Sequence, residues 1–135
     1  MEAFIGKWNF VSSDNFEAYL KEVGVGLMTR KIAANLKPVL EFKGEGSQWT
    51  MTSTSTFKVI VTEFTLGESF DEVTADNRTL KTTFTFEDGK LIQLQKKIKA
   101  EDKDSRIERY IGTDGQLVIG MESGGVVAKR VYQKA

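Results

Sequence analysis

The stretch that decides the fold class reads LKTTFTFE, residues 80–87. Its side chains alternate with a period of two, as in a β-strand with one face toward a core and one toward water. One face carries Leu80, Thr82, Phe84 and Phe86, and the other carries Lys81, Thr83, Thr85 and Glu87. Glu87-Asp88-Gly89 then predicts a tight hairpin turn, because glycine readily adopts the positive φ that such turns need. We therefore expect antiparallel partners for this strand.

Similar segments fill the chain from Pro38 onward. Short runs with period-two patterning alternate with turn signals about every ten residues. The other turn signals are Lys43-Gly44-Glu45-Gly46, Leu66-Gly67-Glu68, Thr113-Asp114-Gly115 and Ser123-Gly124-Gly125. This spacing indicates an all-β antiparallel sandwich or barrel built from about ten short strands. The length of 135 residues suits one domain, which we take as 1–135.

Residues 14–36 are the exception to the strand pattern and predict two short helices after a first strand near residues 5–12. The first helix buries the amphipathic row Phe16, Tyr19, Leu20 and Val23 and takes Asp14 as its cap. The second helix, over 27–36, places Met28, Ile32 and Leu36 on one face and stops at Lys37-Pro38. With few basic residues beside a β array, this pair fits a lid over one end of a barrel better than a DNA-binding motif.

The composition removes several classes of function. Basic and acidic side chains number 19 each, so the net charge is zero and no strong field gathers nucleic acid. The chain has no cysteine and no histidine, which excludes disulfides, thiol nucleophiles, the commonest general base and the commonest zinc ligands. We expect no catalytic residue, metal or cofactor. Without an apolar leader or a membrane-length apolar run, we expect the protein in the cytoplasm.

The interior of the predicted barrel combines apolar and polar positions. Arg109 shares a strand face with Ile107 and Ile111, and Arg130 shares one with Val126, Ala128 and Tyr132; Gln93 and Gln95 lie with Leu91. An unpaired buried charge costs several kcal/mol, so this pattern suits a wet cavity that receives an anion. The alternative is that these arginines point outward or pair with acids across the sheet. Most arginines in strands do this, so periodicity alone favours the alternative. Periodicity also does not say which face is inside.

Motifs along the whole chain resemble those of the intracellular fatty-acid-binding proteins, in particular their heart, adipocyte and myelin-like subgroup. The N-terminal part of the resemblance lies in Gly6-Lys7-Trp8-Asn9-Phe10, Asn15-Phe16-Glu17, Tyr19-Leu20, Gly24-Val25-Gly26, Thr29-Arg30-Lys31 and Lys37-Pro38. The remainder lies in Ser55-Thr56-Phe57-Lys58, Phe64-Thr65-Leu66-Gly67-Glu68, Phe70-Asp71-Glu72, Thr74-Ala75-Asp76-Asn77-Arg78, Gly89-Lys90-Leu91 and Arg130-Val131-Tyr132. A match of this extent is highly specific.

The resemblance implies a fold and a ligand. The fold is a ten-stranded antiparallel clam-shaped β-barrel of the lipocalin (calycin-like) type, with a helix-turn-helix portal lid at about 14–36 and a water-filled cavity for one lipid. Arg109, Arg130 and Tyr132 correspond to the family's carboxylate-binding set, which implies a long-chain fatty acid carried between membranes and other cell sites. Retinoic acid is the alternative ligand, because the same three residues would hold its carboxylate. The loop before Arg106 is longer than usual, so a shifted register would put Arg106 inside instead of Arg109.

The resemblance also implies roles for other residues. The cavity and its portal would be lined by Phe16, Tyr19, Met28, Pro38, Ser55, Phe57, Ala75, Asp76 and Gln95, with Phe57 gating the entrance. Lys21, Arg30 and Lys31 make the lid locally basic, which predicts transient contact with anionic membranes from a monomeric carrier. The simpler interpretation of these charges is a solvated face. The same three positions resemble those of a nuclear-import patch in some relatives, which adds the nucleus to the expected locations.

Overall fold

Ten antiparallel strands form a single sheet in the computed structural model, which describes all residues from 1 to 135. In chain order they are β1 (Gly6–Asp14), β2 (Val39–Glu45), β3 (Gln48–Thr54), β4 (Val59–Thr65), β5 (Ser69–Val73), β6 (Thr79–Glu87), β7 (Lys90–Lys97), β8 (Ser105–Ile111), β9 (Leu117–Ser123) and β10 (Val126–Lys134). Their spatial order is β4-β3-β2-β1-β10-β9-β8-β7-β6-β5. The expected ten-stranded antiparallel architecture is confirmed.

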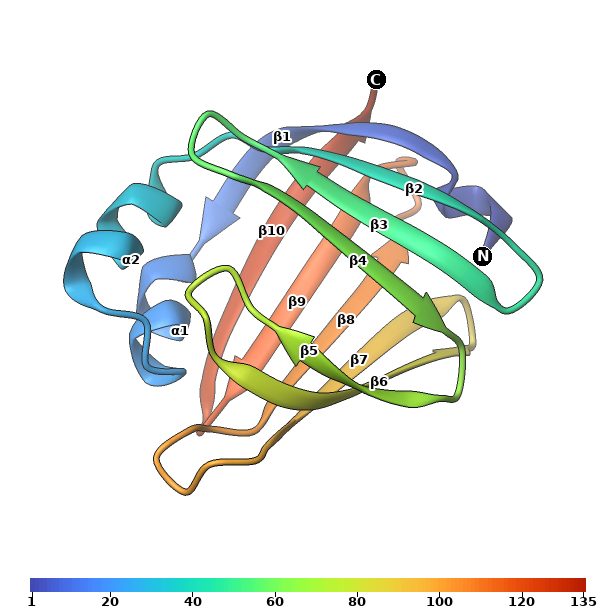
Figure 1. Cartoon of the computed structure of the whole chain (residues 1–135). Helices are drawn as coiled ribbons and strands as arrows, with labels where there is room; N and C mark the ends of the chain where they lie inside the picture. The colour runs from blue at the N-terminus through green and yellow to red at the C-terminus, as the bar shows by residue number, and fades with distance from the viewer.

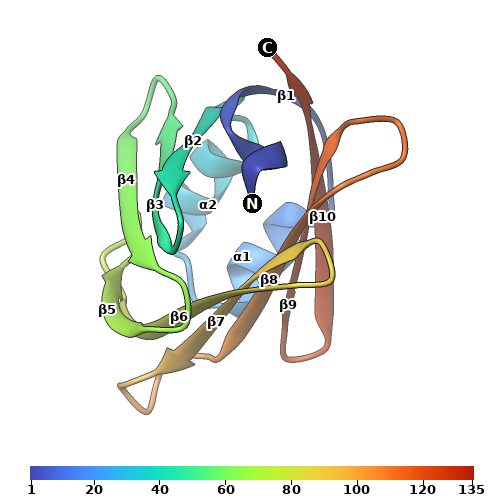
Figure 2. The same cartoon turned by 90° about the vertical axis from the view of Figure 1, so that its right-hand side faces the viewer.

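The sheet curls around an interior and stays open along one line. Every neighbouring pair in the strand order is hydrogen-bonded, whereas β4 and β5, at its two ends, are not paired with each other. Figure 1 shows this gap between the two green strands, and Figure 2 shows the sheet wrapping around the interior. β1 joins the two halves of the barrel, because Gly6–Asn9 pair with β2 and Trp8–Asp14 pair with β10, with a register shift between Phe10 and Ser12.

Two helices cover one end of this barrel. They are α1 (Phe16–Glu22) and α2 (Leu27–Ala34), and the short 3₁₀ helix η1 (Glu2–Phe4) lies at the opposite end (Figure 1). The expectation that Asp14 caps the first helix is wrong. Asp14 still pairs with Lys129 in β1, and the N-cap is Asn15, whose side chain donates to the Val127 carbonyl at 2.8 Å. Neither helix has the length and apolar character that crossing a bilayer requires.

The inner and outer faces follow the predicted alternation. Leu80, Thr82 and Phe84 are fully buried in β6, and Lys81 is exposed. The following turn holds Asp88 and Gly89 at φ of 51° and 77°, the positive values that a two-residue hairpin of this hand requires.

Large side chains fill the end of the barrel that lies farther from the lid. Phe4, Trp8, Phe42 and Leu117 are at most 2% exposed, and the Trp8 indole donates to the Phe4 carbonyl at 2.9 Å. Because this end is packed solid, the interior can hold a ligand only between this packing and α1 and α2.

Candidate ligand-binding site

A cavity of about 310 Å³ lies under the lid. It is bounded by α1, α2, the β3–β4 and β5–β6 turns and the inward faces of seven strands. The predicted residues that line it are Phe16, Tyr19, Pro38, Ser55, Phe57, Ala75, Asp76, Gln95, Arg109 and Arg130. Half of its 28 lining residues are hydrophobic, so the space suits an amphipathic molecule rather than a fully polar one.

Met28 does not line the cavity, which corrects its prediction. Its side chain is 81% exposed on the outer face of α2, together with Leu27 and Ile32 at 61% and 41%. The helical period placed Met28 and Ile32 on one face correctly, but that face points to solvent. The inner face of α2 instead carries the smaller side chains of Thr29 and Ala33, which line the cavity.

Arg109 and Arg130 lie at the same level of the inner wall. In the strand register Arg130 of β10 pairs with Ile119 of β9, and Arg109 of β8 pairs with the same Ile119 from its other side. Their Cα atoms are therefore about 10 Å apart, two strand spacings. Each arginine is only 6% exposed. Arg106 faces outward, where its guanidinium pairs with Glu108 at 2.9 Å, so the register places Arg109 inside.

These arginines hold hydrogen-bond donors that no protein group satisfies. Nε and Nη1 of Arg109 and Nε of Arg130 are buried without a partner. Burial lowers the pKa of Arg109 to about 10, although the Glu72 carboxylate favours its charged form. Burial likewise lowers the pKa of Arg130. Because a guanidinium can only donate, the group that would satisfy these atoms is an acceptor, and an anion would also offset the buried charge.

Arg130 also contacts the lid. Its guanidinium carbon lies 4.2 Å from the centre of the Phe16 ring in α1 and 4.7 Å from that of Phe10. One of its amino groups donates to the Leu36 carbonyl, just after α2, at 3.3 Å. Stacking against two aromatic rings orients the guanidinium, and its Nε remains available to a ligand.

Tyr132 follows Arg130 by two residues on the same face of β10, and so lies farther from the lid than the two arginines. It is 2% exposed, packs edge-on against Phe10 with ring centres 5.7 Å apart, and has its ring centre 5.9 Å from the Arg130 guanidinium carbon. It is not among the residues that line the cavity. Burial raises the pKa of Tyr132, and the charges of Arg130 and Arg109 oppose that rise. The phenol therefore stays protonated near neutral pH, able to donate to an acceptor that reaches it.

Glu72 is a cavity residue that the sequence analysis did not single out. Its Oε1 accepts hydrogen bonds from the Thr82 hydroxyl at 2.7 Å and from the side-chain amides of Gln93 at 2.9 Å and Gln95 at 3.0 Å. One signal was available, since Glu72 shares an inward strand face with Phe70 while Asp71 faces outward. The cavity wall therefore carries the Glu72 carboxylate as well as the two buried arginines, in addition to Asp76 in the β5–β6 turn.

Two turns form the mouth of the cavity, at the same end of the barrel as the lid (Figure 1). Phe57 lies in the β3–β4 turn and is 47% exposed. The Lys58 ammonium of this turn donates to the Ala75 carbonyl of the β5–β6 turn at 2.7 Å. Within the second turn, Asp76 pairs with Arg78 at 2.8 Å. Burial opposes ionisation of Asp76, but hydrogen bonds from Arg78 and Thr74 lower its pKa overall. The two turns are thus held together and internally braced.

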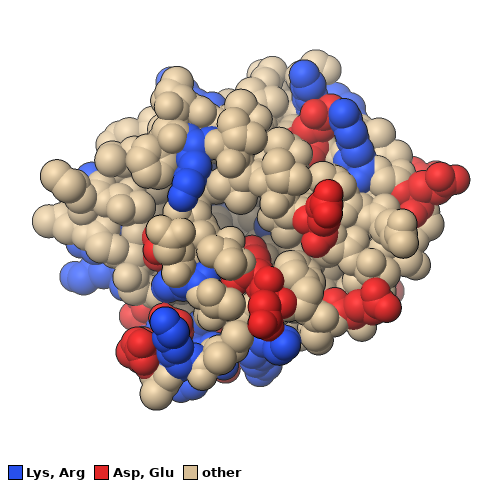
Figure 3. Space-filling view, viewed as in Figure 1, with Lys and Arg blue, Asp and Glu red and all other residues tan.

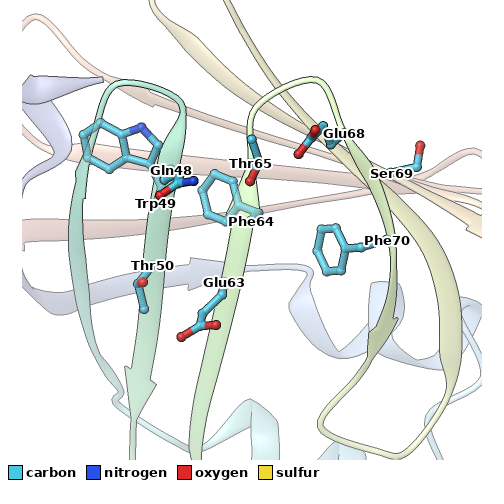
Figure 4. Close-up of a pocket in the computed structure, with 9 residues that line it drawn as sticks. All are labelled: Gln48, Trp49, Thr50, Glu63, Phe64, Thr65, Glu68, Ser69 and Phe70. Atoms are coloured by element: carbon cyan, nitrogen blue, oxygen red, sulfur yellow. The ribbon is translucent and has the colours of Figure 1, made fainter.

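A second hollow, of about 550 Å³, lies over the gap between β4 and β5 and is separate from this site. Figure 4 shows Phe64 and Phe70 on either side of the gap, with Glu63 and Glu68 near its edges. Phe84 stacks on both rings from the inside, at 3.9 and 6.2 Å between centres. The space-filling view shows charges of both signs around the hollow (Figure 3). This hollow contains neither arginine, and aromatic rings fill the gap beneath it.

The barrel, its helical lid and an internal cavity with buried arginines define a cavity-forming β-barrel of the lipid-binding class. The sequence model of the Lipocalin / cytosolic fatty-acid binding protein family matches residues 5–135, and the chain belongs to that family. Fatty acid-binding protein homolog 6 of Caenorhabditis elegans is 53% identical over 131 residues, which cover 97% of this chain and 96% of the relative. The expected family is therefore confirmed.

Solved structures agree with this assignment. The crystal structure of apo lipid binding protein 8 of Caenorhabditis elegans superposes with a TM-score of 0.96 at 41% identity, covering 100% of this chain and 97% of that one. A Schistosoma mansoni fatty acid binding protein in complex with arachidonic acid superposes with a TM-score of 0.91 at 33% identity, covering 100% and 98% of the two chains. Relatives of this fold therefore include one solved with a fatty acid.

Proposed function

We propose that this protein binds one long-chain fatty acid non-covalently in its cavity and carries it between membranes and other sites in the cell. The observation that carries the proposal is the pair of buried guanidiniums, each 6% exposed and with unpartnered N–H groups, beside a half-apolar cavity. Arg109 and Arg130 would hold the carboxylate, with the Tyr132 hydroxyl as a further donor once the head group reaches it. The apolar lining would receive the chain.

The two ends of such a ligand would contribute differently. Burying a methylene gains about 0.8 kcal/mol, so a sixteen-carbon chain gains on the order of 10 kcal/mol before the costs of association are subtracted. The carboxylate would add a net contribution of about 1–3 kcal/mol through charge-assisted hydrogen bonds. The tail therefore supplies most of the affinity, and the arginines decide the orientation.

Retinoic acid is the competing ligand, because its carboxylate would meet the same donors. The relatives described above are named for fatty acids or lipids, which favours the fatty acid. The test is a competition titration in which oleate and retinoic acid displace a common fluorescent fatty acid. We expect oleate to displace it at the lower concentration, and a clear preference for retinoic acid would reverse the assignment.

The proposal describes a carrier rather than an enzyme. The cavity groups named here form hydrogen bonds and ion pairs, and the chain has no histidine or cysteine to act as base or nucleophile. We propose the cytoplasm as its location, and the nucleus as a second one on the strength of Lys21, Arg30 and Lys31. A monomer with one ligand per barrel is part of the same proposal.

The outer face of the lid supports the proposed contact with anionic membranes. Lys21 of α1 and Lys31 of α2 are exposed, as are the apolar Leu27, Met28 and Ile32 of α2, a combination that suits a membrane surface. Arg30 contributes less to this face, because its side chain is 15% exposed and donates to the Val25 carbonyl at 3.0 Å. Lys31 also pairs with Glu17 at 2.6 Å. The free positive charge of the lid is therefore concentrated on Lys21.

A further inference from the structure

A buried acceptor in the cavity lacks a donor. Gln93 is 2% exposed and lines the cavity, and its Oε1 has no hydrogen-bond partner. Its amide orientation follows from its neighbour, because Nε2 donates to the Glu72 carboxylate, which would repel an amide oxygen. The hydrogen bonds that Glu72 accepts all fall on Oε1, which leaves its Oε2 without a donor. Gln93 Oε1 and Glu72 Oε2 are thus two acceptors that no protein donor satisfies.

This acceptor pair lies closer to the lid than the two arginines do. Arg109 pairs with Leu91 across the sheet, and Gln93 follows two residues later on the same face of β7. One such step is about 7 Å along a strand. β7 runs from the packed end toward the lid end of the barrel (Figure 1), so Gln93 lies on the lid side of the arginine row. A fatty acid anchored at that row would pass this point with an early or middle part of its chain.

We propose that the cavity has a second polar subsite, formed by Gln93 Oε1 and Glu72, that accepts a hydrogen bond from a hydroxyl group within the chain of a hydroxylated long-chain fatty acid. The proposal rests on the fatty-acid function above and names the subclass of ligand that satisfies both sets of cavity groups. The arginines need acceptors, which the carboxylate supplies. Gln93 Oε1 is buried without a donor, and a hydroxyl supplies one whereas a keto group does not.

The test compares three ligands of equal chain length by calorimetry: stearate, stearate with a hydroxyl on its ninth carbon, and stearate with a keto group on that carbon. The keto acid matches the hydroxy acid in position and size but cannot donate. We expect the hydroxy acid to bind at least about fivefold more tightly than the keto acid, the worth of one buried hydrogen bond. Binding of stearate itself reports on the fatty-acid function independently.

Variants then locate the effect. Gln93→Met keeps an unbranched side chain without the amide and should reduce the hydroxy-to-keto preference, whereas Gln133→Met, on the exposed end of β10, should retain it in full. If thermal melting shows that Gln93→Met is unfolded, Glu72→Gln replaces it, with the expectation of a reduced preference. Equal affinity for the two acids in the wild type, or a preference unchanged in the folded variant, overturns the subsite while stearate still binds. Failure of stearate to bind would instead overturn the proposed function.

Discussion

Arg109 and Arg130 flank a single residue, Ile119, with which each pairs from opposite sides of β9. This register puts two buried guanidiniums at one level of the inner wall, two strands apart. A barrel that buries two such charges without a carboxylate hydrogen-bonded to either one loses folding free energy. The loss is understandable if the site is built for an anionic ligand, and the predictions below test that interpretation.

Replacing Arg130 separates its role in binding from its role in folding. Arg130→Gln should weaken oleate binding about fivefold or more, because the charge-assisted hydrogen bonds of the head group are lost. The melting temperature should stay the same or rise, since the buried charge is gone. Calorimetry and thermal melting measure the two effects. Lys129→Gln is the matched control on the adjacent, exposed position of the same strand, and equal affinities in the two variants would remove Arg130 from the site.

Arg109 should show the stability effect more strongly. Burial lowers its pKa from the ordinary value to about 10, so the unfolded chain binds this proton more tightly than the folded chain. The charged group therefore opposes folding at every pH below about 10, and the penalty is relieved only as the pH rises through that value. At pH 7, Arg109→Gln should stabilise the ligand-free protein by about 1–3 kcal/mol while weakening oleate binding.

The control for Arg109 is Arg106→Gln, three positions away on the outer face. It should change neither oleate affinity nor, beyond about 0.5 kcal/mol, stability, because Arg106 forms only a surface ion pair with Glu108. If Arg106→Gln weakened binding and Arg109→Gln did not, β8 would face the other way in the protein and the register described here would be wrong.

Phe57 is expected to control the rate of exchange rather than affinity. Its ring is 47% exposed in a mouth turn that also lines the cavity, so we expect a passing ligand to displace it. Phe57→Ala should speed oleate release several-fold in stopped-flow measurements while Kd changes less, because entry is eased as well. Val61→Ala, at an exposed position on the outer face of β4, is the control. Identical release rates in both variants would make Phe57 an ordinary packing residue.

Charge reversal on the lid tests the proposed membrane contact. Lys21→Glu combined with Lys31→Glu should slow fatty-acid transfer to phosphatidylserine vesicles, and added salt should reduce the difference. The control is the double variant Lys43→Glu and Lys90→Glu. These residues lie next to the β2–β3 and β6–β7 turns, which are at the end of the barrel opposite the lid (Figure 1). If both double variants transferred at the wild-type rate, the lid charges would be a solvated face.

The strand pattern of the sequence was enough to predict the architecture. Alternation in residues 80–87 and glycine turns at regular spacing reflect the two faces and tight turns of an antiparallel sheet, and these are local properties. The orientation of the second helix, by contrast, is not a local property of the sequence. Met28 and Ile32 share a face as predicted, but only the packing of α2 over the cavity decides that this face points outward.

The polar interior was predicted in part. Arg109 and Arg130 were singled out, but periodicity does not reveal which strand face points inward. That is decided by the way the whole sheet curls, and the pairings with Ile119 then bring the two arginines to one level. Glu72 was missed because an acid in a strand ordinarily faces water. Its inward position makes sense only when Thr82, Gln93 and Gln95 are brought around it by β6 and β7.

The most direct test of the central claim is a pH titration of bound oleate carrying ¹³C at its carboxyl carbon, followed by NMR. Two guanidiniums within reach of the carboxylate would hold its pKa well below that of the same group in water. We predict that the bound carboxyl resonance stays constant through the range in which an exposed carboxyl titrates, and that it begins to titrate when Arg109 and Arg130 are both replaced by Gln. A resonance that titrates normally in the wild-type protein would mean that the head group lies in solvent, and it would contradict the account.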